Sequence, residues 1–122
     1  MIARAALVFA AVLALGCYHV GQLVHLVSAR DTGAPPIYAE QCSSCHGDAG
    51  HGDGVAGRAL EPRPRNFADG RWQATTSDDR IRFVIRNGGR AAGLFPLMAP
   101  HGDLTDAQLD ALVAYIRRVG EG

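Results

Sequence analysis

The chain has 122 residues, and its 12 basic side chains balance its 12 acidic ones, so the formal net charge is zero. This length allows one small domain with an appendage, and a domain of about ninety residues often needs a disulfide, a metal or a prosthetic group to complete its core. Three cysteines are too few for a disulfide framework, and the lack of a basic face with interleaved aromatic residues excludes a nucleic-acid-binding protein.

Residues 1–29 differ from the rest and are the predicted signal or anchor segment. A basic residue, Arg4, precedes an apolar run from Ala5 to Cys17, and a mixed stretch follows as far as Val27. A basic start followed by an apolar segment is typical of an export signal. If the segment is retained, the 23 residues 5–27 can cross a bilayer whose hydrocarbon core is about 30 Å thick. We therefore expect a single N-terminal transmembrane helix.

Two other fates of this segment stay open. Cleavage after Val27-Ser28-Ala29 would satisfy the small-residue rule of signal peptidase sites. The run Ala14-Leu15-Gly16-Cys17 is similar to a bacterial lipobox, in which Cys17 would carry the lipid.

Residues 30–36 are predicted to be a linker, because Gly33, Pro35 and Pro36 interrupt any regular pattern. Residues 37–122 then form the predicted folded domain. A short helix from Ile37 to Cys42 begins this domain and leads into its most informative motif.

The run Cys42-Ser43-Ser44-Cys45-His46 has the C-x-x-C-H pattern of covalent haem c attachment. Two thiols at this spacing can form thioethers with both vinyl groups of one haem, and the imidazole that follows can bind the iron. A thioredoxin-type dithiol does not require His46, and no second ligand pair completes a zinc site. We therefore predict one haem c, held by Cys42 and Cys45, with His46 as an iron ligand.

Residues 47–65, after the motif, are rich in glycine and proline and are predicted to form a loop. A loop of this length without secondary structure of its own is normally functional or disordered. We expect it to wrap the edge of the haem.

Two amphipathic helices are predicted in the second half of the domain. The first begins at Thr76, with Asp79 as its capping partner, and ends at Gly88-Gly89. The second begins at Thr105, where Gln108 completes a capping box. Their apolar stripes are Ile81, Val84 and Ile85 in the first helix and Leu109, Leu112, Val113 and Ile116 in the second. No strand of useful length is predicted, so the fold class is all-α.

Met98 is the candidate for the second iron ligand. It lies in Pro96-Leu97-Met98-Ala99-Pro100, where the prolines stiffen the backbone and limit the entropy that ordering the loop would cost. The other methionine, Met1, belongs to the export segment. Met98 could instead fill a gap in the core, and His101 and His51 are competing ligands.

Together these features resemble monohaem class I cytochromes c over about residues 36–119. The resemblance rests on the haem motif at 42–46, the glycine-rich run 47–57, Arg63-Pro64-Arg65-Asn66-Phe67, Met98 and Leu112-Val113-Ala114-Tyr115-Ile116. It implies a small all-α domain with long loops around a covalently bound haem, here preceded by the N-terminal hydrophobic helix. It also implies that a first helix, Ile37 to Cys45, crosses a last helix, Asp106 to Val119.

The resemblance further implies contacts for the haem and its ligand. The carbonyl of Pro62 or Pro64 would accept the N–H of the proximal imidazole and so fix its ring. Buried haem propionates need cationic or N–H donors, and the candidates are Arg63, Arg65, Arg71 and Trp72. The arginines could instead be solvated surface charge.

The predicted function is electron transfer by a His/Met-ligated haem, not catalysis of a substrate reaction. Eight arginines and four acidic residues lie within residues 58–90, and this basic flank could steer an acidic redox partner. The competing function is a haem with an open distal site that serves a gas or peroxide sensor or an enzyme.

Covalent haem attachment takes place outside the bacterial inner membrane, so we expect the domain to lie in the periplasm. It would be an anchored carrier, or the cytochrome subunit of a larger oxidoreductase with integral membrane subunits. A lipoprotein at Cys17 and a cleaved, soluble periplasmic protein are the alternatives.

Overall fold

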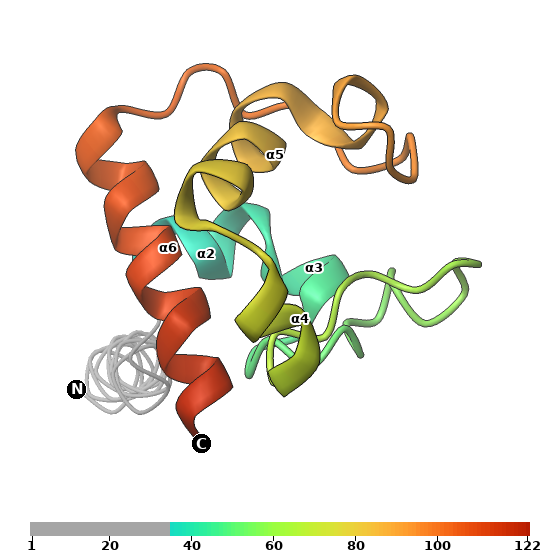
Figure 1. The fold of residues 1–122 in the computed structure, drawn as a ribbon. Helices are drawn as coiled ribbons and strands as arrows, with labels where there is room; N and C mark the ends of the chain where they lie inside the picture. Colours follow the sequence, from blue (N-terminus) through green and yellow to red (C-terminus); the bar gives the residue numbers. More distant parts are fainter. Residues whose placement is uncertain (1–34) are drawn as a thin grey trace, which may run out of the picture. The chain divides into compact units, whose positions relative to one another are not determined.

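The computed structural model describes residues 35–122, and the expected anchor at 1–29 lies outside these residues. The helices are α2 (Pro36–Gln41), α3 (Ser43–His46), α4 (Gly70–Thr75), α5 (Asp78–Ala91) and α6 (Asp106–Glu121), as drawn in Figure 1. Residues 35–122 contain no strand, which confirms the all-α expectation for the described part. Within the same residues, no helix has the length and apolar character that a membrane crossing requires.

The last helix, α6, was predicted correctly in its start and its buried face. The Thr105 side chain accepts a hydrogen bond from the Gln108 amide, and the Gln108 side chain accepts one from the Thr105 amide. This reciprocal pair satisfies donors that the first turn of a helix leaves without partners. The four stripe residues are each at most 3% exposed: Leu109, Leu112, Val113 and Ile116.

Helix α5 begins one residue later than predicted, because a short helix that we did not predict ends just before it. Thr76 is the C-cap of α4, whereas Ser77 is the N-cap of α5 and accepts a hydrogen bond from the Arg80 amide. The side chain of Asp69 starts α4 by accepting from two amides of its first turn. Gly88 has a φ of 79°, so the helical geometry of α5 breaks at the predicted position.

The core lies among α2, α5 and α6. Tyr38 of α2 packs on Tyr115 of α6 with ring centroids 4.5 Å apart, so the first and last helices meet as expected. The buried apolar side chains are Tyr38, Phe67, Ile81, Ile85, Leu104, Leu109, Leu112, Val113, Tyr115 and Ile116.

Two loops contribute almost nothing to this core. We call them the motif loop (residues 47–66) and the Met98 loop (residues 92–103). In Figure 1 the motif loop and the first part of the Met98 loop extend to the side of the described domain away from α6, and the Met98 loop then returns along the top to α6. Neither loop supplies any of the buried apolar side chains of the described residues. The core therefore comes from the helices together with Phe67 and Leu104, whereas the two loops have no buried apolar side chain of their own.

Candidate functional site

Helices α2 and α3 meet at Cys42, so the helix expected from Ile37 to Cys45 is present as two pieces. The Cys42 amide ends α2 on the Tyr38 carbonyl, and the His46 amide donates to the Cys42 carbonyl, both at 2.9 Å. Cys42 and Cys45 are free, half-buried thiols. Burial, followed by the neighbouring Cys45, raises the pKa of Cys42 to about 11, so this thiol is protonated at neutral pH.

The glycine-rich part of the motif loop wraps the backbone of α3. The amides of Gly52, Gly54 and Ala56 donate to the carbonyls of His46, Cys45 and Ser44 at 2.7, 3.2 and 2.9 Å. These bonds satisfy the carbonyls that the end of a helix leaves free. A Cβ atom at Gly54 would collide with the carbonyl of Ser44, so only glycine permits this approach. The glycines therefore allow the loop to contact the motif itself.

Two tyrosines hold the backbone directly after His46. The Tyr38 hydroxyl donates to the Gly47 carbonyl at 2.7 Å, and the Tyr115 hydroxyl donates to the Asp48 carbonyl at 2.9 Å. Burial raises the pKa of both phenols, so both remain protonated donors at neutral pH. The first and last helices thus jointly fix the exit of the chain from the motif.

The His46 ring is held on two sides by one short segment. Its Nδ1 lies 3.2 Å from the Arg65 carbonyl oxygen, and its ring stacks on Phe67 with centroids 4.7 Å apart and an interplanar angle of 15°. The carbonyl that reaches the ring in this structure is that of Arg65, not that of Pro62 or Pro64.

The tautomer of His46 follows from this contact. A carbonyl oxygen can only accept, so Nδ1 carries the proton and the neutral ring keeps a lone pair on Nε2. Burial lowers the pKa of His46 and outweighs the opposite effect of the Arg65 carbonyl. The ring is therefore neutral at neutral pH, which is the form that can bind a metal through Nε2.

Met98 lies on a loop whose backbone is tied to the end of α5. The Gly89 amide donates to the Met98 carbonyl at 2.9 Å, and the His101 amide donates to the Ile85 carbonyl at 3.0 Å. A Cβ atom at Gly88 would lie 2.9 Å from the Met98 carbonyl oxygen, closer than real Cβ atoms approach. The double glycine therefore ends α5 and also admits the Met98 backbone. Sequence reasoning had assigned it only the first role.

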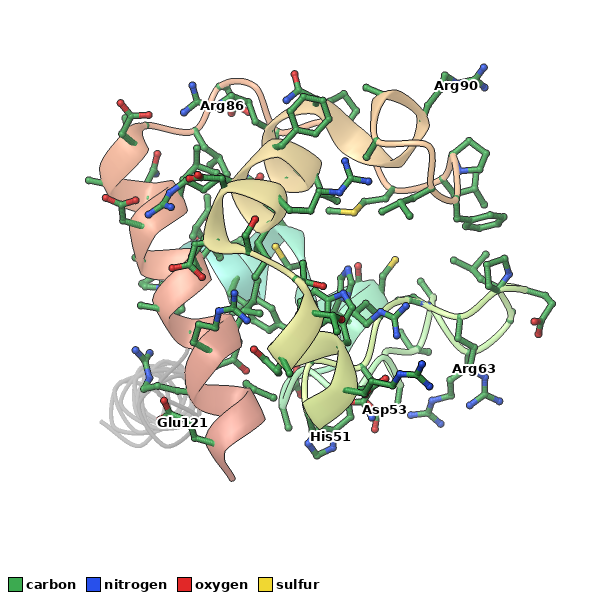
Figure 2. All side chains as sticks on the ribbon, in the orientation of Figure 1. His51, Asp53, Arg63, Arg86, Arg90 and Glu121 are labelled. Atoms are coloured by element: carbon green, nitrogen blue, oxygen red, sulfur yellow. The ribbon has the colours of Figure 1, made fainter. Side chains whose placement is uncertain are left out.

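The two competing histidines lie on different loops of the described domain, with His101 half-buried and His51 exposed. His101 Nδ1 contacts Gln41 Oε1 at 2.9 Å, and Gln41 directly precedes Cys42, so this pair links the Met98 loop to the motif. His51 is exposed, on the motif loop. Figure 2 labels it at the edge of the domain.

The predicted propionate residues divide into two groups. Arg65 and Trp72 come together, with the Arg65 guanidinium carbon 5.8 Å from the Trp72 ring centroid, and Trp72 lies 5.8 Å from the Phe67 ring. Arg65 also pairs with Asp69 at 3.4 Å. Arg63 and Arg71 are exposed and have no acidic partner among the described residues.

The residues present fit a haem c in three respects. Two free thiols precede a neutral imidazole whose Nε2 has a lone pair to offer. A thioether at Met98 lies on a loop fixed to α5. The two loops lack an apolar interior, and a large apolar group between them would supply one. In contrast, residues 35–122 hold no cluster of three or more His, Cys, Asp or Glu side chains that could bind another metal.

Comparison with known proteins agrees with this chemistry. A family model described as cytochrome c oxidase, cbb3-type, subunit III matches residues 30–116. No solved structure gives a significant match to the chain.

Proposed function

The chain belongs to the family of cbb3-type cytochrome c oxidase subunit III, a class I c-type cytochrome family, and from this premise we propose that it carries electrons through one His/Met-ligated haem c. Cys42 and Cys45 would hold the haem through two thioethers, and His46 and Met98 would ligate its iron. The observation that carries the proposal is the neutral His46 ring, held at Nδ1 by the Arg65 carbonyl directly after two free thiols. When bound, haem c supplies an iron that exchanges one electron between Fe(III) and Fe(II).

The chain's own residues would hold both ligands in place. The Arg65 carbonyl fixes the His46 ring. Because it accepts a hydrogen bond from the Nδ1–H group, it also raises the basicity of Nε2. Gly89 and Ile85 hold the backbone of the Met98 loop at the Met98 carbonyl and at the His101 amide. If His46 and Met98 both ligate the iron and are held in place, no coordination position is left for a substrate. This arrangement favours electron transfer over substrate binding. Met as second ligand also raises the reduction potential relative to a second His.

The choice between Met98 and an open distal site can be tested with one substitution. We expect the oxidised protein to show the weak long-wavelength absorption of Met-ligated ferric haem, and the reduced protein to resist carbon monoxide. Met98→Ala should keep the covalent haem, lose that band, bind carbon monoxide and lower the reduction potential. His101→Ala is the matched control on the same loop and should keep the band. An unchanged spectrum in Met98→Ala would overturn the ligand assignment, and a wild-type protein that lacks the band and binds carbon monoxide when reduced would favour the sensor or enzyme function.

We also propose that the domain lies at the outer face of the bacterial inner membrane and joins integral membrane subunits of an oxidase complex. The printed description of the family and the apolar residues 5–27 support this placement. Membrane fractionation with mass determination of the mature N-terminus tests it. An intact N-terminus in the membrane fraction supports the retained anchor. A lipid on Cys17, or a soluble chain that begins at Arg30, would replace it with the corresponding alternative.

We propose that the redox partner docks on the exposed surface of the motif loop and the Met98 loop. Both loops expose large apolar side chains: Val55 of the motif loop is 81% exposed, and Leu97 and Leu94 of the Met98 loop are 65% and 53% exposed. Figure 2 labels Arg63 beside the motif loop and Arg90 near the end of α5, and neither has an acidic partner among the described residues. A partner with an acidic, partly apolar surface would complement these exposed arginines and apolar side chains. Arg63→Glu should then slow electron exchange with the partner and weaken the dependence of its rate on salt concentration. An unchanged rate would argue against docking on this surface.

A further inference from the structure

We propose that Gln73 is a positioning residue for the His46 imidazole, although it touches neither that ring nor the iron site. This inference rests on the proposed function, because it takes His46 as the proximal iron ligand. It adds a residue of α4, a helix that sequence reasoning did not foresee, to the machinery that sets the properties of the iron.

The segment of residues 65–67 orients the His46 imidazole in two directions. Within residues 65–67, the Arg65 carbonyl faces Nδ1 at 3.2 Å and the Phe67 ring covers one face of the imidazole at 4.7 Å. A hydrogen bond at Nδ1 alone allows the ring to rock about that bond, whereas the stacked ring opposes this motion. The position of the Arg65–Phe67 segment therefore determines both the tilt of the imidazole and the length of its hydrogen bond.

Gln73 holds this segment against α6. Its Nε2 donates to the Phe67 carbonyl at 2.7 Å and to the Ile116 carbonyl at 2.8 Å, so both amide protons are used. The Phe67 amide donates to the Gly50 carbonyl at 2.8 Å. Both backbone polar groups of Phe67 are thus engaged, and its ring is only 7% exposed. A Cβ atom at Gly120 would lie 2.5 Å from the Gln73 amide, so glycine there leaves room for it.

Arg117 of α6 fixes which way the Gln73 amide points. Its guanidinium donates to Gln73 Oε1 at 2.7 Å and to the Gln73 carbonyl at 3.0 Å. The same group donates to the Thr76 carbonyl at 2.6 Å and to Asp78 at 2.8 Å. With Oε1 committed to Arg117, the Gln73 amide can present only its donors to Phe67. Contacts thus run without a break from Arg117 through Gln73 and Phe67 to His46.

The position of this segment would affect how strongly His46 donates electrons to the iron. A firm hydrogen bond at Nδ1 makes the imidazole a stronger donor to the metal, and hydrogen bonding around a ligand is one of the means by which a protein tunes haem potential. If the segment moves, the bond to the Arg65 carbonyl lengthens and the imidazole donates less. Fe(III) is then stabilised less, and the reduction potential rises.

The test compares two neutral substitutions of glutamine in the full-length, haem-loaded protein. Gln73→Met keeps the length of the side chain but removes both amide donors. Gln108→Met is the matched control, because it breaks the capping box of α6 without touching residues 65–67. We expect Gln73→Met to raise the reduction potential and to shift the paramagnetic proton resonances of the His46 ring. Gln108→Met should move neither, although it also lowers stability.

A second variant guards against loss of folding in Gln73→Met. Gln73→Glu keeps an acceptor for Arg117 but still cannot donate to the Phe67 carbonyl, so it should shift the His46 ring resonances relative to Gln108→Glu. Unchanged potential and ring resonances in a Gln73 variant that carries covalent haem would overturn the role of Gln73 and leave the proposed function intact. Wild-type protein without covalent haem would instead overturn the proposed function, and this inference with it.

Discussion

The helices and the two loops of this domain are held together by different means. In the helical part, apolar side chains of α2, α5 and α6 bury one another, and Tyr38 and Leu112 are each only 1% exposed. In the loops, backbone hydrogen bonds and closely packed glycines hold the chain, and the large side chains Val55 and Leu97 face outward. We therefore expect the helices to form a scaffold without the two loops. Met98 lies on one loop and the Cys42–His46 motif directly precedes the other, and a haem between the loops would supply the apolar interior that they lack.

Preventing haem attachment should affect the loops far more than the helices. Cys42→Ala combined with Cys45→Ala should abolish covalently bound haem completely, because no thioether can form. The loops should then lose protection from hydrogen exchange to a much greater extent than α5 and α6, as measured by mass spectrometry. Cys17→Ala removes the third cysteine and should keep the haem and the protection. Equal loss of protection in loops and helices would show that the helices are not an independent scaffold.

The next largest effect is expected from the helical core. Leu112→Ala removes a buried side chain and leaves a cavity, which should cost about 2 to 5 kcal/mol in the free energy of unfolding. Denaturant unfolding followed by circular dichroism measures this change. Val55→Ala, at an exposed loop position, should stay within about 0.5 kcal/mol of wild type. Similar costs for the two variants would remove the distinction between core and loops.

A glycine at the junction of the two regions should have an intermediate effect. In Gly89→Ala the new Cβ would lie 3.3 Å from the Met98 Cβ and would collide with the Phe95 carbonyl. We expect a loss of about 1 to 3 kcal/mol, together with a weaker absorption band from Met ligation. Gly70→Ala meets no atom within 4 Å and should preserve both. A normal band in Gly89→Ala would mean that the Met98 loop is positioned without the contact to α5.

The smallest effect should come from a helix end far from both ligands. Thr105→Ala removes the N-cap of α6 and should cost about 1 kcal/mol. The visible spectrum and the reduction potential should not change, since the cap contacts neither His46 nor Met98. Parallel unfolding curves and redox titrations check both statements. A shifted potential in Thr105→Ala would show that the scaffold and the iron site are coupled more generally than through Gln73.

Features that depend on local sequence signals were predictable, whereas features that depend on tertiary contacts were not. The start of α6 and its buried stripe follow from a capping box and a regular apolar period, which are local signals. Helix α4 has six residues and no buried side chain, so only the Asp69 cap could have indicated it. The acceptor for His46 Nδ1 was sought at Pro62 or Pro64 and is Arg65, because tertiary packing decides which carbonyl of a loop reaches a ring.

The roles of Phe67 and Gln73 show the same limit. Phe67 was part of the run that carried the family resemblance, but its stacking on His46 depends on a fold between residues 21 positions apart in the chain. Gln73 lies on a helix that was not predicted, and its partners belong to two other parts of the domain. No local pattern encodes such contacts, so they emerge only from the three-dimensional arrangement.

The central claim, that His46 and Met98 ligate one covalently bound haem, is tested most directly by near-infrared magnetic circular dichroism of the oxidised, full-length protein. The position of the charge-transfer band in this spectrum distinguishes His/Met from His/His ligation and from an open distal site. We predict the His/Met band in the wild-type protein and its loss in Met98→Ala. A His/His band, or the high-spin signal of an open site, in the wild-type protein would contradict the claim.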